Sequence, residues 1–411
     1  MLNISLPNYK KISVAEKKFR QQNFDIFKKN GFPIRKDENW KFTNIKEKIE
    51  NSFSNLNFLH KKNKNIREKS LKEFKHSSIF LQDGDLTKIN IQIADKKKIK
   101  IKNLKFSDIK KQRSLNTLGI LNNAFFSGGF VISIKQNADL KYPLIFYNNF
   151  SKKLNNCGLN KKYIFNFLKN SSANIVFVNN DFSEGNYFLN QNSNYNLDTN
   201  AKINFYNIYL RNNSINYSNV TANINQDASL KFINILSNTS FLKKDFFTNL
   251  NEKNSNCEIY SNAILKKNEH FELQTVMSHL APYCTSYQKV KKVLEDDAKG
   301  VYQGKIYVKK NAQKTDAYQL SKAILLNNET EFDAKPELEI YADDVKCSHG
   351  SSSGNLDENA IFYLMSRGLD RKQATNLLIE GFFRDIAETI NHTEIKKYLI
   401  KIIEKKANEI R

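Results

Sequence analysis

Several features that mark common protein classes are missing from this chain of 411 residues. Its four cysteines lie far apart and form no CxxC pair, which argues against a zinc ribbon and against a disulfide framework. No apolar run approaches the roughly 18 residues of a membrane span, and the N-terminus has no apolar core of signal-peptide length. We therefore expect a cytoplasmic protein with reduced thiols and no membrane contact.

Arginine is also scarce, although the net charge is +23. A strongly basic surface ordinarily suggests a nucleic-acid partner, because binding releases counterions. Only nine residues are arginine, the side chain that forks onto phosphate and guanine, and the lysines are spread along the whole chain among asparagine and isoleucine. We expect no nucleic-acid partner, and a basic nucleic-acid-binding solenoid stays an alternative without a motif.

Motifs of nucleotide-dependent and hydrolytic enzymes are absent as well. The sequence contains no GxxxxGK[ST] phosphate loop, no GxGxxG after a strand, no GxSxG elbow and no HExxH. We therefore expect no ATP site in this chain.

What is present divides into three parts. Residues 1–75 have helical patterns, with Phe19, Phe24 and Phe27 at helical spacings and Gly31 as a stop signal. The only tryptophan, Trp40, lies in DENWKFTNI, and core packing is its expected role. This part is predicted to be a small N-terminal helical domain.

Residues 76–350 change to short alternating strands such as NIVFV, KINFYNIYL and LKFINI. Polar turn signals (NSSA, DTNA, NQDA and EKNSN) precede several of them and recur every 27 to 28 residues, after which the spacing widens to about 40 and then 32. A strand repeat of this length without intervening helices predicts a parallel β-helix or solenoid whose later coils carry insertions. A sandwich is the alternative.

Residues 351–411 are predicted to form a C-terminal helical domain. Asn355 with Glu358, and Asp370 with Gln373, have the offset of capping boxes. Gly368 follows the first helix as a stop signal. On the second helix, Leu377 and Phe382 belong to one apolar face.

The stretch DDVKCSHGSSSG holds the most chemically specific pair. If it continues the last strand, Cys347 and His349 project from the same face, because side chains alternate along a strand. Thiolate and imidazole suit zinc, copper or an iron–sulfur cluster, but two ligands make only part of a site. A buried Cys with a hydrogen-bonded His, a Cys-His nucleophilic dyad and a surface turn are the alternatives. His279 and Cys284 could be imagined as another metal pair, although structural roles are expected for them.

Within residues 297–387, GVYQGKIYVKKNAQKTDAYQ, AKPELEIYADDVKCSHG and LDENAIFYLMSRGL resemble the SufB/SufD family of iron–sulfur cluster assembly scaffold proteins. ENWKFTNI, at 38–45, is similar to the N-terminal signature of SufD members. Gly350 follows His349, as in SufD members, whereas SufB members carry Glu there. Ser351, Ser352 and Ser353 depart from the usual Ala-Thr and a variable residue.

The resemblance implies a right-handed parallel β-helix flanked by N-terminal and C-terminal α-helical domains. It also implies a heterodimer with a SufB-like paralogue through the β-helices and docking of the ATPase SufC through the C-terminal helices. Cys347 and His349 would then lie at the SufB interface, where His349 is the better candidate ligand for a transient cluster shared with SufB. We expect helix 370–390 to dock SufC with Phe382 and Phe383 as anchors, or else to pack only on its own domain.

The predicted function is therefore a SufD-like, non-catalytic scaffold subunit of an ATP-driven assembly complex. A SufB-like paralogue and an enzyme that uses a Cys-His site alone are the alternatives. An exposed last strand would also allow a homodimer when the chain is alone.

Overall fold

The computed structural model describes residues 4–7, 9, 12–58, 70–109 and 116–410. In these ranges the α-helices are α1 (Val14–Asn30), α2 (Ile45–Ser52), α3 (Thr117–Phe125), α4 (Glu358–Ser366), α5 (Arg371–Glu388) and α6 (Thr393–Ala407). The short 3-10 helices are η1 (Glu38–Trp40), η2 (Ile93–Asp95) and η3 (Phe106–Asp108). The strands are β1 (Ser77–Gln82), β2 (Asp85–Asn90), β3 (Ile99–Asn103), β4 (Gly128–Ile134), β5 (Leu144–Phe150), β6 (Cys157–Phe167), β7 (Ser172–Asp181), β8 (Tyr187–Leu197), β9 (Lys202–Ile224), β10 (Ser229–Ser237), β11 (Thr239–Leu250), β12 (Asn256–Leu265), β13 (His270–His279), β14 (Thr285–Leu294), β15 (Lys299–Val308), β16 (Thr315–Leu325), β17 (Glu331–Ile340) and β18 (Val345–Gly354).

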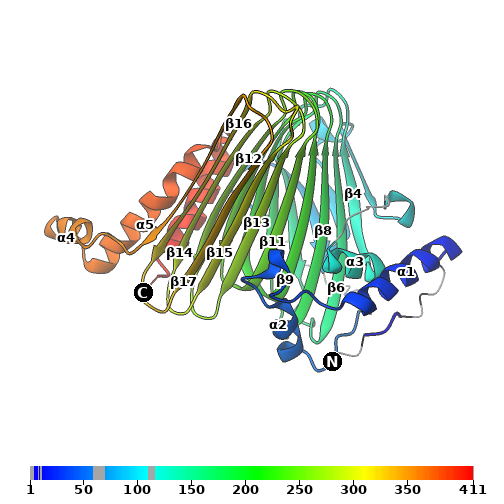
Figure 1. Cartoon of the computed structure of the whole chain (residues 1–411), viewed down its shortest axis with the longest axis horizontal. Coiled ribbons are helices and arrows are strands. Elements are labelled where there is room, and N and C mark those ends of the chain that lie inside the picture. Colours follow the sequence, from blue (N-terminus) through cyan, green and yellow to red (C-terminus); the bar gives the residue numbers. More distant parts are fainter. Residues whose placement is uncertain (1–3, 8, 10–11, 59–69, 110–115, 411) are drawn as a thin grey trace.

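The strands wind into a solenoid of about eight turns with two parallel sheets (Figure 1). Sheet A runs through β4, β6, β8, the second half of β9, β11, β13, β15 and β17. Sheet B runs through β1, β5, β7, the first half of β9, β10, β12, β14, β16 and β18. Antiparallel strands β3 and β2 extend the N-terminal ends of the two sheets. The predicted parallel solenoid with helices at both ends is confirmed.

The polar turn signals of the sequence form one column of turns along the solenoid. Asn170, Asn200, Asp227 and Asn254 all have φ between 55° and 59° in this column. Asparagine and aspartate adopt this left-handed conformation more readily than most residues, which explains their recurrence. Backbone N–H groups of these residues donate to carbonyls of the next turn, so the column is also hydrogen-bonded.

The later coils are longer than the 27-residue coil between β10 and β12, at 29 to 32 residues, but the predicted widening to about 40 residues is wrong. From β4 to β18, paired residues of successive coils are separated by 26 to 33 residues, for example 27 between Ser229 and Asn256 and 32 between Lys299 and Glu331. The sequence does not mark the late turns, because Tyr283 and Lys314 occupy the left-handed positions there, with φ of 59° and 60°. Neither residue type marks such a turn in a sequence.

Stacked side chains fill the interior between the sheets. Phe146, Phe177, Phe205 and Phe232 form an aromatic column with successive ring centroids 5.3, 6.4 and 5.4 Å apart. A row of asparagine carboxamides runs beside it, from Asn148 through Asn179 and Asn207 to Asn234, with hydrogen bonds of 2.9 to 3.3 Å. Part of the asparagine content is thereby explained, since the middle amides, Asn179 and Asn207, each accept from one neighbour and donate to the next.

The N-terminal segment packs on the outer face of sheet A. Trp40 is buried, and its ring lies 5.5 Å from that of Tyr217 and 4.8 Å from Lys243 Nζ. Thr43 Oγ1 donates to the carboxylate of Glu272, which also forms a buried ion pair with Lys243. The predicted packing role of Trp40 is confirmed, and the ENWKFT stretch is held by buried charges as well as by apolar contact.

The C-terminal helices α5 and α6 cover the outer face of sheet B. Their apolar side chains, including Ile379, Phe383 and Leu399, form one buried cluster with outward side chains of sheet B such as Val178 and Ile208. Within the described ranges, no helix has the length and apolarity needed to cross a membrane.

The solenoid begins at Ser77 in β1 and ends at Gly354 in β18. Helix α3 lies between β3 and β4 in the sequence, yet it packs against α1, for example through Phe125 and Phe24. A sequence boundary near residue 75 therefore does not separate all the residues that pack with the N-terminal helices, and the division at 75 and 350 stays a proposal.

Candidate functional site

The solenoid ends in an uncovered coil made of β17 and β18. Each of these strands pairs along one edge only, β17 with β15 and β18 with β16, among the strands that the structure describes. Most of their side chains are half-buried or exposed, whereas the preceding coils are largely buried. An edge strand of this kind presents unpaired backbone groups to a partner.

Cys347 and His349 lie on β18 and both face the inside of this last coil. Cys347 is in register with Ala317, and His349 is in register with Gln319, both of which are buried interior residues of β16. The predicted alternation along the strand is therefore present. The Cys347 side chain is half-buried and that of His349 is exposed.

The electrostatic setting of Cys347 does not favour a nucleophile. Burial, followed by the negative charge of Asp316, raises the pKa of the Cys347 thiol. Reactive cysteines have lowered pKa values, usually beside a cation or a helix N-terminus. An enzyme that attacks through Cys347 alone is therefore disfavoured.

As ligands, the two side chains make only part of a metal site. No group of three or more His, Cys, Asp or Glu side chains suitable for a metal ion occurs within the described ranges. Sulfur and nitrogen donors on the rim of an open coil would need further ligands from another molecule.

A buried polar cluster lies immediately inside the pair. Gln288, Tyr302 and Gln319 are all fully buried, and the Tyr302 hydroxyl lies 3.3 Å from Gln288 Oε1 and 3.5 Å from Gln319 Oε1. Gly304 makes room for them, since a Cβ there would come within 2.4 Å of both Tyr302 Oη and Gln319 Oε1. Buried polar side chains therefore lie directly behind the open end of the solenoid.

The conspicuous aspartates before Cys347 belong to a turn. Asp344 forms an ion pair with Lys314 at 2.5 Å, and its backbone N–H donates to Gln313 Oε1 at 2.9 Å. Within the AQKTDA stretch, Thr315 Oγ1 donates to the Ala312 carbonyl. These contacts give Asp344 and the AQKTDA stretch structural roles in the turn.

His279 and Cys284 are buried in ordinary hydrogen bonds. His279 Nε2 lies 2.9 Å from Ser286 Oγ, and Cys284 Sγ lies 3.1 Å from Ser255 Oγ. Burial lowers the pKa of His279 to about 4, so the imidazole is neutral at pH 7. These contacts fit the structural roles expected for both side chains.

The proposed docking anchors on α5 pack on this chain's own solenoid. Phe383 is 1% exposed and belongs to the cluster between α5 and sheet B. Phe382 is partly buried against the same cluster, with Lys291 Nζ 4.7 Å from its ring and bonded to its carbonyl at 2.5 Å. In this structure, therefore, the Phe383 ring is not available to a partner.

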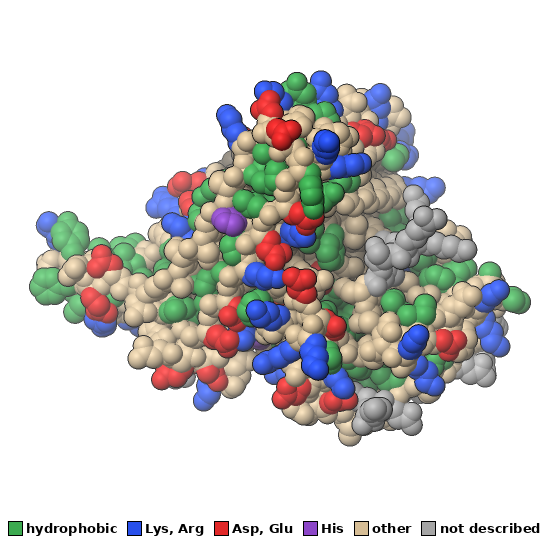
Figure 2. Space-filling model, viewed as in Figure 1, with side chains coloured by type: hydrophobic (Ala, Val, Ile, Leu, Met, Phe, Trp, Pro, Cys, Tyr) green, Lys and Arg blue, Asp and Glu red, His purple; other side chains and the backbone are tan. Residues whose placement is uncertain are grey.

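Sequence reasoning missed a different apolar surface on the C-terminal helices. Phe362, Tyr363 and Met365 on α4 and Leu377 on α5 are 41% to 73% exposed. Figure 1 shows α4 projecting from the body, and Figure 2 shows hydrophobic side chains at that end. The signal was present in IFYLM, because a helix that is apolar on every side cannot bury all of its faces against one neighbour. We call these four residues the α4 patch.

Comparison with known proteins places the chain in a family. Residues 150–382 match the family described as "SUF system FeS cluster assembly, SufBD core domain". The chain belongs to the SufB/SufD family. The matched region covers most of the solenoid and reaches Phe382 on α5.

Curated relatives place the chain near the SufD branch. It is 35% identical over 175 residues to the iron-sulfur cluster assembly protein SufD of Escherichia coli (strain K12), covering 43% of this chain and 41% of that protein. It is 31% identical over 141 residues to SufD of Bacillus subtilis (strain 168), covering 34% and 32%. A SufBD family protein of Synechocystis is 39% identical over 109 residues, covering 26% and 24%. The chain thus spans about two fifths or less of the length of these relatives. Two of these three relatives are SufD proteins, so the chain is SufD-like.

Proposed function

We propose that this chain is a SufD-type scaffold subunit in iron–sulfur cluster assembly, and that its open coil is one half of an interface with a SufB-like paralogue. The observation that carries the proposal is the position of Cys347 and His349 on the inner face of a strand with one unpaired edge. A cluster being assembled there is cargo, and His349, with Cys347 beside it, would contribute ligands that the partner completes. Family membership and the SufD relatives support this assignment.

The partner proposal extends to the C-terminal helices. We propose that a SufC-like ATPase docks on the α4 patch, because the patch is exposed, apolar and carried on a projecting helix. Phe382 and Phe383 would contribute indirectly, because they pack α5 against the solenoid and so hold the α4 patch in place. Closure of two ATPase subunits would then rotate or strain the paired solenoids and open their interface to iron and sulfide.

The chain's own part in this mechanism is coordinative and mechanical. It carries no phosphate-loop motif, and the raised pKa of Cys347 does not suit covalent catalysis. A SufB identity fits less well, since Gly350 follows His349 in place of a carboxylate. We place the protein in the cytosol, where its four free cysteines would stay reduced.

The test separates the ligand role from the architecture of the complex. The chain would be co-expressed without oxygen with SufB-like and SufC-like proteins of the same source, as the unaltered chain, His349→Ala and Ser348→Ala. Ser348 is the matched control, since it neighbours His349 but points to the opposite face of β18. We expect iron and acid-labile sulfide to be lost from the His349→Ala complex and kept in the Ser348→Ala complex. Equal cluster content in both variants would contradict the ligand role of His349, even where the complex itself forms.

A further inference from the structure

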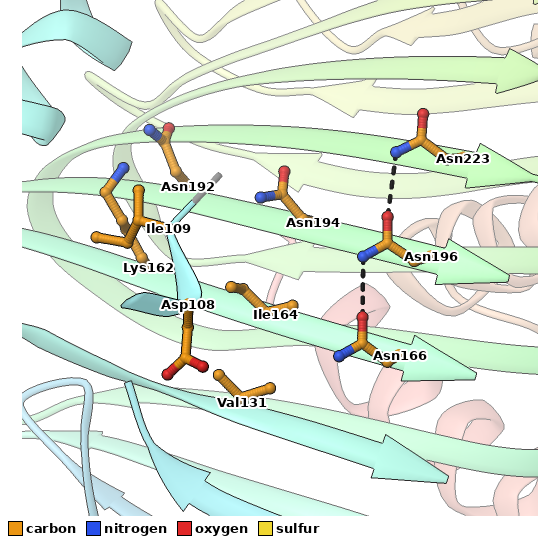
Figure 3. Close-up of a pocket in the computed structure, with 10 residues that line it drawn as sticks. All are labelled: Asp108, Ile109, Val131, Lys162, Ile164, Asn166, Asn192, Asn194, Asn196 and Asn223. Carbon is orange, nitrogen blue, oxygen red and sulfur yellow. Dashed lines mark hydrogen bonds between the residues drawn. The ribbon is translucent and has the colours of Figure 1, made fainter. Parts of the chain in front are cut away.

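A polar cavity of about 370 Å³ lies over sheet A, near its N-terminal end (Figure 3). Its main lining is five asparagine side chains from β6, β8 and β9: Asn166, Asn192, Asn194, Asn196 and Asn223. They project from the outer face, since the intervening Phe165 and Phe167 belong to the solenoid interior. Lys162 and Asp108 of η3 lie toward one end of the lining, and Asn223, Asn196 and Asn166 lie toward the other.

One wall of the cavity is held rigid by a ladder of amides. Asn223 Nδ2 donates to Asn196 Oδ1 at 3.2 Å, and Asn196 Nδ2 donates to Asn166 Oδ1 at 3.0 Å (Figure 3). Because each amide is fixed by the next, the groups facing the cavity have their directions set before any molecule enters. Ordering them on binding would therefore cost little entropy.

Asn192 is the second observation that indicates a ligand. It is only 6% exposed, and neither its Nδ2 nor its Oδ1 has a hydrogen-bond partner in the described part of the chain. A buried amide left without partners costs about 1 to 3 kcal/mol per group. Its place in the lining, beside Lys162, gives these atoms a partner if a polar molecule occupies the cavity.

Lys162 brings to the cavity a buried amine that no acidic side chain in the described part of the chain pairs with. It is 7% exposed, its Nζ donates to Asn123 Oδ1 at 2.8 Å, and it forms no ion pair with any described residue. Burial, and then the nearby Arg20 charge, lowers the pKa of Lys162 to about 7. Asp108 does not compensate, because it is paired with Lys102. A single negative charge beside Lys162 would be favoured.

We propose that this cavity binds a small hydroxylated carboxylate, with the carboxylate at Lys162 and the hydroxyl groups along the asparagines. Hydroxyls both donate and accept, as do carboxamides, so the two sets match. Val131 and Ile164 offer apolar contact to the carbon chain. A nucleobase fits poorly, because it would stack on an aromatic side chain and no described lining residue is aromatic. A divalent cation also fits poorly, because Asp108, the one carboxylate among the described lining residues, is already paired with Lys102.

The test uses the full chain alone, so it does not depend on any partner protein. D-gluconate is the probe and sorbitol is its uncharged match, with binding measured by calorimetry and ligand-observed NMR. We expect gluconate to bind at least about tenfold more tightly than sorbitol, because a charge-assisted hydrogen bond contributes about 1.5 to 3 kcal/mol. Lys162→Met and Asn192→Leu should each weaken gluconate binding by about tenfold. Lys152→Met, at an exposed lysine outside the cavity, should leave it unchanged.

Three results would overturn the proposal. They are no binding of gluconate, equal binding of gluconate and sorbitol, and unchanged gluconate affinity in either cavity variant that circular dichroism shows to be folded. If Lys162→Met does not fold, the gluconate and sorbitol comparison on the unaltered chain, together with Asn192→Leu, still decides the matter.

Discussion

His349 and Gln319 are direct neighbours across the last pair of parallel strands, with both side chains on the inner face of the solenoid. Gln319 is fully buried, whereas His349, one strand spacing of about 4.8 Å further out, is exposed. Burial is therefore lost within one coil, although the inward pattern of side chains continues. A second protein surface on this coil would complete the burial.

Cys347 should be the first cysteine to react with a maleimide in the native chain. The other three cysteines are buried, and only Cys347 is half-buried at the open end. We expect one label per chain at short times, located at Cys347 by mass spectrometry. Its rate should be slower than that of an exposed thiol, because burial raises its pKa.

The same label should report on the interface. When a SufB-like protein is bound, Cys347 should be protected, while an added control cysteine at exposed Ser352 on the outer face of β18 should still react. Equal labelling of Cys347 with and without the partner would place the interface elsewhere.

Phe383 should matter for stability rather than for docking. Its ring is 1% exposed in the cluster between α5 and sheet B, so Phe383→Ala should lower the free energy of unfolding by about 3 to 5 kcal/mol. Phe362→Ala, at a 73% exposed ring on α4, should change it by no more than about 0.5 kcal/mol. Urea unfolding of both variants measures the difference, and similar values would show that the α5 packing is misplaced.

Phe362 should contribute to binding of the SufC-like ATPase rather than to stability. Phe362→Ser with Tyr363→Ser should abolish co-purification of a SufC-like protein while leaving the melting temperature nearly unchanged, because both rings are more than half exposed. Ile26→Ser, at an exposed isoleucine on α1, is the control for loss of an apolar surface side chain. Retained SufC-like protein in the α4 variant would contradict docking on the α4 patch.

Lys244 should make stability depend on pH. Burial lowers its pKa in the folded chain from 10.5 to about 7. Between these two values the unfolded chain binds more protons, so the contribution of Lys244 to stability rises with pH, by at most about 1.4 kcal/mol per pH unit. The free energy of unfolding of Lys244→Met should therefore exceed that of the native chain by most near pH 7, and this difference should shrink toward pH 9.

Unfolding in urea at pH 7 and pH 9 measures this difference. Lys152→Met is the control, because this lysine is exposed on the surface. A Lys244→Met advantage that does not change with pH would contradict the burial of a neutral amine.

Much of the architecture follows from local chemistry in the sequence. Asn170 and Asn200 mark turns because asparagine tolerates a left-handed backbone, and Cys347 and His349 share a face because strands alternate. The turn at Tyr283 could not be predicted, because tyrosine has no preference for the left-handed conformation. Local patterns make coil-by-coil stacking predictable only where the turn residue is a typical one.

The surfaces were harder to predict, because they depend on packing between distant segments. Helical spacing shows that α5 has an apolar face but not that Phe383 meets sheet B. Likewise, the cavity over sheet A brings Asp108 of η3 together with Asn192 and Asn223, which lie on different coils. No sequence pattern places Lys162 beside Asn192.

The most direct test of the central claim is the native mass of the assembly formed when this chain is co-expressed anaerobically with SufB-like and SufC-like proteins. We predict a stable complex with one copy of this chain, one SufB-like subunit and two SufC-like subunits. If the chain instead purified alone, or only as a homodimer, the open coil would not be half of a heterodimer interface, and Cys347 and His349 would need an explanation within this chain or a symmetric pair.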